Sequence, residues 1–174
     1  LAAVGYLALP LLVFCAGWLK WPYAIAACLL ALVAIAAALP PRGIARRAPL
    51  SRATLLLIGL AGFAWAAFGG AGHIFYANSD WVVRDAVLMD LVHAAWPPSY
   101  AEQGGDPVIL RTTLGYFLPA AALGSLFGAG TADAFLYAWT GLGAALFLLL
   151  LPLPQGRTRL AVALGVVVLF SGMD

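Results

Sequence analysis

Residues 73–111 read HIFYANSDWVVRDAVLMDLVHAAWPPSYAEQGGDPVILR, and they form the one long polar interval in an otherwise apolar chain. Five of the seven acidic residues and both histidines lie in this interval, which hydrophobic runs flank on each side. Within it, Asn78-Ser79-Asp80-Trp81 precedes apolar residues at helical spacing over 82–92, and Trp96-Pro97-Pro98 follows. This order predicts a loop, then a surface helix over residues 81–94, and an end of that helix at the two prolines. Any chemistry that the chain performs is expected here.

The composition indicates a membrane protein. Of the 174 residues, 64% are hydrophobic and 9% are charged, and a water-soluble domain cannot bury so much apolar surface. Several apolar runs approach the roughly 20 residues that cross a bilayer as a helix, without the period-two alternation of a barrel. We expect an all-α polytopic transmembrane protein with one membrane module over 1–174. Because the chain starts at Leu1 and stops where an apolar run meets Asp174, we also expect a fragment of a longer protein.

The arginines predict the topology. Residues 42–52 carry four arginines and no acid, so the positive-inside rule assigns them to the cytoplasmic side and makes the loop 71–133 extracytoplasmic. If both later apolar stretches crossed, the basic turn 155–159 would lie outside. We therefore expect the shorter stretch, residues 113–127, to lie at the outer membrane surface or to dip in partway. The predicted spans are residues 1–19, 23–39, 53–70, 134–153 and 160–172.

Asp80 has two interpretations. It belongs to a group with Asn78 and Ser79 in which one short polar side chain caps the surface helix, an interaction worth about 1 kcal/mol. Alternatively, its carboxylate beside the apolar Trp81 is partly desolvated at the membrane surface and acts as a general base or a metal ligand. Arg84 follows Asp80 at the favourable spacing for an exposed ion pair. One residue can serve as both cap and catalyst.

Arg111 also has two interpretations. It lies outside, where the positive-inside rule does not require it, and it could be a snorkelling anchor or a partner for Asp106. Alternatively, its guanidinium binds a phosphate through paired hydrogen bonds. The histidines His73 and His93 are too isolated for a zinc motif. The sequence has no phosphate-binding loop, nucleophile elbow or nucleic-acid-binding feature, so nucleic acid is not an expected partner.

These motifs together resemble a known superfamily. The outer-loop sequence NSDW (residues 78–81), the surface helix after it and LRTTLGYFLP (residues 110–119), leading to LFG (residues 126–128), resemble the N-terminal part of the GT-C membrane glycosyltransferases. The resemblance covers roughly Ala53 to Asp174. It implies extracytoplasmic juxtamembrane helices and a location in a bacterial inner membrane. It also implies transfer of a sugar from a polyprenyl-phosphate donor to an acceptor at the extracytoplasmic face.

The resemblance assigns roles to individual residues. Asp80 would be the base that activates an acceptor hydroxyl, or a ligand for a divalent metal such as Mg or Mn. Arg111, with Arg84 as a second candidate, would bind the donor phosphate. Asp174 would be an acid of the second outer loop. The expected reaction is an inverting displacement at the anomeric carbon.

Two other functions fit the sequence. A transporter or flippase of a lipid-linked or anionic solute would have charges or broken helices near the bilayer midplane. A non-catalytic membrane subunit would use the outer loop only as a docking surface. The predicted spans contain no charge within the hydrocarbon, and the acids gather on one side, so the enzyme is the favoured interpretation.

Overall fold

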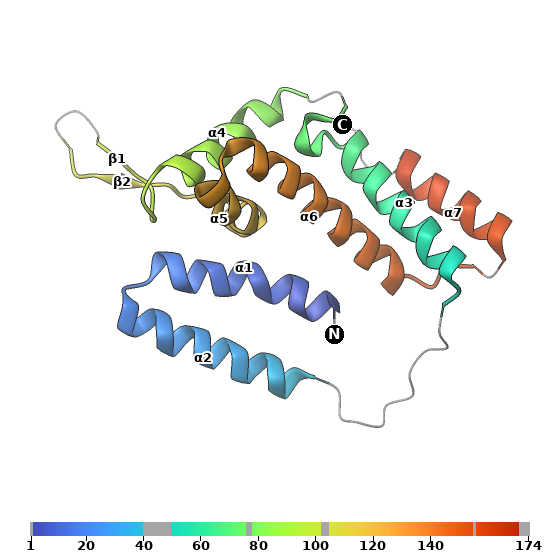
Figure 1. Cartoon of the computed structure of the whole chain (residues 1–174), viewed down its shortest axis with the longest axis horizontal. Helices are drawn as coiled ribbons and strands as arrows, with labels where there is room; N and C mark the ends of the chain where they lie inside the picture. The colour runs from blue at the N-terminus through green and yellow to red at the C-terminus, as the bar shows by residue number, and fades with distance from the viewer. Residues whose placement is uncertain (1, 40–49, 76–77, 102–104, 155, 171–174) are drawn as a thin grey trace. The chain divides into compact units, whose positions relative to one another are not determined.

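The structure is a computed structural model that describes residues 2–39, 50–75, 78–101, 105–154 and 156–170. These residues are mostly helical, which confirms the all-α fold class (Figure 1). The helices are α1 (Ala2–Trp18), α2 (Trp21–Ala38), α3 (Arg52–Phe68), α4 (Asp80–His93), α5 (Leu118–Phe127), α6 (Ala129–Leu150) and α7 (Arg157–Phe170). Two short antiparallel strands, β1 (Ser99–Tyr100) and β2 (Val108–Ile109), form a hairpin in which Ser99 pairs with Ile109.

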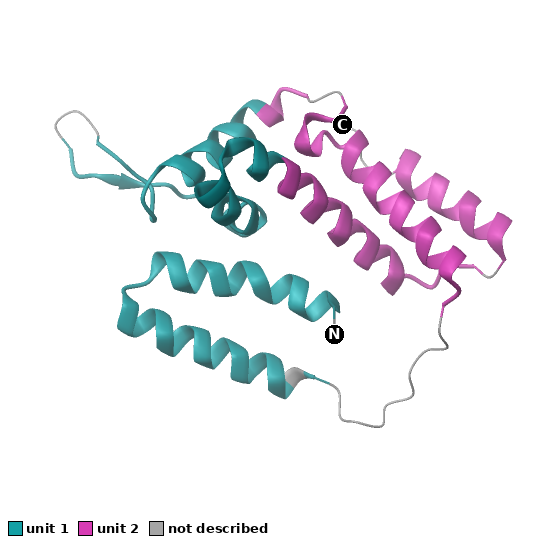
Figure 2. Cartoon of the chain, in the orientation of Figure 1, with its two compact units in different colours: residues 1–39, 82–133 teal, residues 40–81, 134–174 magenta. Residues whose placement is uncertain are grey.

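The chain divides into two compact units, and neither is continuous in sequence (Figure 2). Unit 1 comprises Leu1–Leu39 and Val82–Asp133, and unit 2 comprises Pro40–Trp81 and Ala134–Asp174. The chain passes between the units within α4 and again within α6.

In unit 1, α1 and α2 form an antiparallel helical hairpin (Figure 1). The turn is tight, because the backbone N–H groups of Tyr23 and Ala24 both donate to the carbonyl oxygen of Lys20 at 2.9 Å. Pro22 lies in the first turn of α2, where backbone N–H groups have no partner within the helix, so the lack of an N–H in proline costs no hydrogen bond. The two helices have nearly the extents of the predicted spans 1–19 and 23–39.

The apolar stretch 113–127 is not one helix. A 3₁₀ turn, η2 (Leu114–Tyr116), comes first, and α5 begins at Leu118 with Pro119 in its first turn, a position that suits proline. Gly128 ends α5, because its φ of 97° lies in a region that favours glycine. The next helix therefore begins at residue 129, earlier than the predicted start at 134.

In unit 2, α3 packs against α6 and α7. Its core consists of five buried apolar residues, Ile58, Ala145, Leu148, Leu160 and Leu164. Gly62 on α3 brings the backbones of α3 and α6 close together, since a Cβ atom there would lie 2.6 Å from the backbone nitrogen of Ala145. About two turns before Ala145 on α6, the Tyr137 hydroxyl donates to the carbonyl oxygen of Phe63 at 3.3 Å.

Among the described residues, α6 is the one helix that is long and apolar enough to cross a membrane by length and composition. Four shorter helices, α1, α2, α3 and α5, are also apolar. At 1.5 Å per residue, α5 is about 15 Å long, which is roughly half of the 30 Å hydrocarbon thickness.

Candidate functional site

Asp80 is the first residue of α4, and the cap of this helix is supplied by a neighbour. The side-chain oxygen Oδ1 of Asn78 accepts a hydrogen bond from the backbone N–H of Asp80 at 3.2 Å. The carbonyl oxygen of Asn78 accepts from the N–H of Trp81 at 3.1 Å. Asn78 is thus the capping residue among the three that the sequence offered. Asp80 is exposed, and its carboxylate makes no hydrogen bond within the part of the chain that the structure describes.

Trp81 anchors the start of α4 in unit 2. Its side chain is only 4% exposed, and its indole Nε1 donates to the carbonyl oxygen of Gly69 at 3.0 Å. A side chain at Gly70, where φ is 82°, would overlap the indole ring. Because Trp81 turns toward this glycine turn, it does not cover Asp80. Asp80 is therefore not buried by Trp81 within the protein, and its partial desolvation at a membrane surface stays a prediction.

The segment that holds Trp81 has an unusual backbone. His73 has a φ of 57°, which side-chain-bearing residues rarely adopt, and it follows Gly72 with a φ of 69°. The rings of His73 and Trp81 lie 5.9 Å apart in an edge-to-face arrangement. The turn after α3 is therefore shaped around the indole, so that Trp81 fixes where α4 begins.

Arg84 and the rest of α4 belong to unit 1. Val87, Leu88, Leu91 and Val92 form the buried face of the helix, whereas Arg84 and the preceding valines are exposed. Val82, which the predicted apolar stretch 82–92 includes, is 71% exposed and lies outside this buried face. Arg84 follows Asp80 by about one helical turn.

Arg111 lies directly after the β1–β2 hairpin. The N–H of Leu110 donates to the carbonyl oxygen of Pro98 at 3.0 Å, which extends the hairpin pairing up to this point. Arg111 is exposed, and so is Asp106. Within the described ranges the two side chains do not form an ion pair, so Asp106 is not the partner that one interpretation assigned to Arg111. Asp80 lies in unit 2 and Arg111 in unit 1.

Several predicted residues lie outside the described ranges. They include Asp174, the predicted second-loop acid, as well as Glu102 and the basic residues of the stretch 42–49. Within the described ranges, no three His, Cys, Asp or Glu side chains are close enough together to hold a metal ion. Metal binding by Asp80 stays a prediction.

One polar pair was not predicted. The Tyr100 hydroxyl on β1 donates to Oδ2 of Asp90 on α4 at 2.5 Å. This hydrogen bond to the Asp90 carboxylate, together with its negative charge, raises the pKa of Tyr100. The pair joins the hairpin to the surface helix. The nine residues between the two partners include a turn, so no helical or strand spacing could reveal the pair.

A second unpredicted contact joins the outer loop to α1. Trp96 lies over Gly17, where a Cβ atom would overlap the indole, and its ring centre is 5.4 Å from that of Trp18. Its Nε1 donates to the carbonyl oxygen of Leu91 at 2.6 Å. The end of α4 is thereby attached to the α1–α2 turn within unit 1.

Comparison with known protein families, curated proteins and solved structures finds no match.

Proposed function

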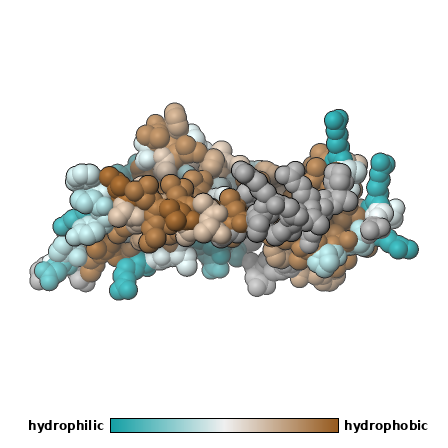
Figure 3. All heavy atoms as spheres, turned by 90° about the horizontal axis from the view of Figure 1, so that it is seen from below, coloured by the Kyte–Doolittle hydropathy of each residue, from teal (hydrophilic) through white to brown (hydrophobic). Residues whose placement is uncertain are grey.

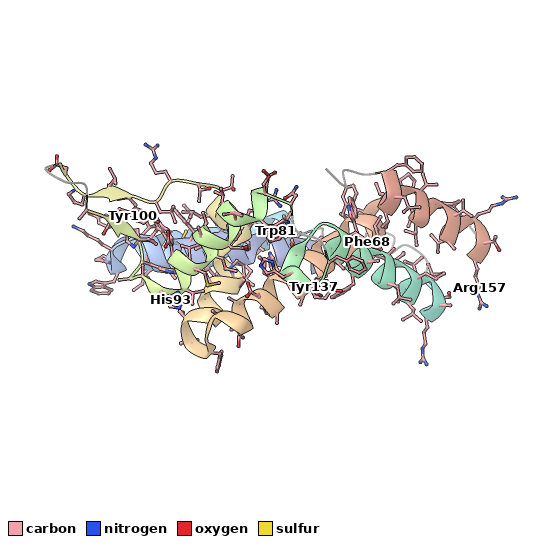
Figure 4. The ribbon with its side chains drawn as sticks, turned by 90° about the horizontal axis from the view of Figure 1, so that it is seen from above. Phe68, Trp81, His93, Tyr100, Tyr137 and Arg157 are labelled. Atoms are coloured by element: carbon pink, nitrogen blue, oxygen red, sulfur yellow. The ribbon has the colours of Figure 1, made fainter. Side chains whose placement is uncertain are left out.

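We propose that this chain is a polytopic membrane protein with its Asp80-bearing loop on the extracytoplasmic side. The support in unit 2 is the position of its basic residues. Ile58 near the start of α3, Leu148 near the end of α6 and Leu160 at the start of α7 pack in one cluster. The exposed Arg52 and Arg157 are the first residues of α3 and α7. Trp81 bonds to Gly69 at the other end of α3, and Figure 4 shows Arg157 far from Trp81. Within unit 2, a basic end opposite the end that bears Asp80 is consistent with the positive-inside rule.

Unit 1 supports the same topology independently. In the proposed arrangement, both the α1–α2 turn and the loop 71–133 are extracytoplasmic, and the contact between Trp18 and Trp96 requires them to lie on one side. Seven large apolar side chains of α2 are between 50% and 75% exposed: Trp21, Tyr23, Ile25, Leu29, Leu30, Leu32 and Val33. Brown, apolar side chains also cover much of the face in Figure 3. Exposed apolar surface of this extent suits contact with lipid.

The topology can be tested by cysteine labelling in a background without Cys15 and Cys28. Arg157→Cys and Asp106→Cys both introduce a thiol at an exposed position. In intact right-side-out vesicles, a membrane-impermeant maleimide is expected to modify Asp106→Cys, and Arg157→Cys only after permeabilisation. Modification of Arg157→Cys in sealed vesicles would contradict the proposal.

We infer further that the protein transfers a sugar from a polyprenyl-phosphate donor to an acceptor hydroxyl. The observation that carries this proposal is the exposed Asp80 carboxylate at the start of α4. Asn78 caps the helix, so the Asp80 carboxylate is not needed for capping, and Trp81 fixes the position of the helix start. The acceptor oxygen attacks the anomeric carbon as its proton passes to Asp80, and the bond from that carbon to the phosphate oxygen breaks. The lipid phosphate leaves with the bonding electrons, and a guanidinium stabilises its charge.

Arg111, with Arg84 as the second candidate, is proposed to bind that phosphate. Arg111→Ala is expected to raise KM for the donor roughly 10- to 100-fold, because charge-assisted hydrogen bonds are worth about 1.5 to 3 kcal/mol. Arg111→Lys keeps the charge without the two-pronged donor geometry, so its KM should lie between those of Arg111→Ala and wild type. Arg159→Lys, on the proposed cytoplasmic side, is the matched control and should leave KM unchanged. Equal KM values for Arg111→Ala and wild type would exclude phosphate binding by Arg111.

A transporter is the second candidate, and the break between α5 and α6 favours it. A ten-residue apolar helix that ends at Gly128 is the kind of interrupted helix found in transport pathways. The two functions are distinguished in proteoliposomes that contain polyprenyl-phosphate sugars and soluble acceptors. Incorporation of labelled sugar into the acceptor supports the transferase. Movement of the intact labelled lipid across the bilayer without such incorporation supports the transporter.

A further inference from the structure

We propose that residues 112–128 form a re-entrant hairpin in the extracytoplasmic half of the bilayer. The chain enters beside α1 in a non-helical stretch, reaches its deepest region around η2 and returns to the surface as α5. This inference rests on the proposed crossing of the membrane by α1. The sequence allowed residues 113–127 either to lie at the outer membrane surface or to dip in partway, and the proposal selects the second position.

The depth of η2 follows from its contact with α1. A Cβ atom at Gly115 would lie 3.8 Å from the Cβ of Pro10, so this glycine is in van der Waals range of α1. Pro10 is eight residues before Trp18, which corresponds to about 12 Å along the helix axis. With Trp18 at the headgroup level, Pro10 lies close to the centre of a hydrocarbon layer roughly 30 Å thick.

The return to the surface follows from contacts at the other end of α5. At Gly124 a Cβ atom would lie 2.7 Å from Val92 on α4 and 2.6 Å from Ala132 on α6. The end of α5 therefore packs against the surface helix and the start of α6, and both η2 and α5 contact α1. The length of α5, about 15 Å, matches half of the hydrocarbon thickness. Leu126 and Phe127, which are 73% and 69% exposed, present apolar surface to lipid at this end.

The backbone of the hairpin makes local hydrogen bonds, and Thr112, Thr113 and Gly115, which precede α5, are exposed. Non-helical backbone is tolerated at such depth only where protein shields it or its polar groups are bonded. The N–H of Leu114 donates to the carbonyl oxygen of Thr112 at 2.8 Å, and the N–H of Phe117 donates to that of Leu114 at 2.9 Å. The side chains of Leu118, Ala120 and Ala121 at the start of α5 are fully buried. The non-helical segment thus leads into a part of α5 that protein covers.

The test uses nitroxide labels on the full chain in liposomes of phosphatidylcholine and phosphatidylglycerol, with Cys15 and Cys28 replaced by alanine. Gly115→Cys is the probe of the deepest region, and its side chain meets only ordinary contacts. Leu11→Cys, at an exposed position of α1 next to Pro10, is the membrane reference, and Asp106→Cys is the aqueous reference. Collision of each label with oxygen, which concentrates in lipid, is compared with collision with a water-soluble nickel complex.

The label at Gly115 is expected to show an oxygen-to-nickel collision ratio close to that at Leu11 and several-fold above that at Asp106. A ratio equal to that at Asp106, with Leu11 still in lipid, would overturn the hairpin alone. An aqueous ratio at Leu11 would instead remove the crossing of α1, and the hairpin with it. Gly130→Cys, which has open space around it, should react with impermeant maleimide from outside. Reaction from inside alone would mean that the segment spans the membrane and would also overturn the proposal.

Discussion

Asp80→Asn is expected to lower the rate of sugar transfer at least roughly 100-fold, which is the lower end of the usual contribution of a general base. The carboxamide has nearly the shape of the carboxylate but cannot accept the proton of the acceptor hydroxyl. The helix start should persist, because Asn78 supplies the cap and Trp81 supplies the anchor. The loss should therefore appear in kcat at unchanged expression and unchanged thermal stability. Transfer is measured in membrane vesicles with a labelled polyprenyl-phosphate sugar.

Asp106→Asn is the matched control for this variant. It removes one negative charge from an exposed position of the same loop, outside any helix. Its transfer rate should equal that of wild type. If Asp80→Asn and Asp106→Asn both retain full activity, Asp80 is not the base, and the transferase proposal loses the residue on which it depends.

Gly62→Ala is expected to destabilise unit 2 by about 1 to 3 kcal/mol, the usual effect of overpacking a close contact. The added methyl group would lie 2.6 Å from the backbone nitrogen and 2.9 Å from the Cα atom of Ala145. Backbone atoms cannot rotate away as the end of a side chain can, so α3 and α6 must move apart. The measurement is the unfolding midpoint of the purified protein in mild detergent under titration with a denaturing detergent.

Gly59→Ala on the same helix provides the comparison. No atom lies within 4 Å of the position that its Cβ would occupy, and alanine favours helix over glycine. The midpoint of Gly59→Ala should therefore equal or exceed that of wild type. If both variants unfold at the same point, the helices do not approach each other at Gly62 as described.

The helices could largely be predicted from sequence, because each apolar run is bounded by local signals. Lys20 and Pro22 separate α1 from α2, and Ser51 caps α3 by accepting a hydrogen bond from the N–H of Thr54 at 3.1 Å. The start of α5 could not be predicted, because a 3₁₀ turn, Leu114–Tyr116, lies within the same continuous apolar run. Hydrophobicity alone cannot distinguish the two, since both bury the same kinds of side chain.

The surroundings of Asp80 could be predicted only in part. A polar residue before Trp81 indicated a helix cap, and the structure assigns that cap to Asn78. The burial of Trp81 depends on a carbonyl group twelve residues earlier, at Gly69. Such a bond follows from the path of the turn after α3 and not from the identity of the neighbouring residues. Trp96 and Gly17, which are in contact, are even further apart in the sequence, and no periodicity connects them.

That last contact also determines an order of events during biosynthesis. At about 5 to 20 residues per second, the ribosome takes roughly 4 to 16 s to proceed from Gly17 to Trp96. Throughout that time, the side of α1 at Gly17 lacks the indole that covers it in the finished protein. The α1–α2 hairpin must consequently hold together through its own helix packing. Unit 1 is completed only after the whole of residues 40–81 has been synthesised.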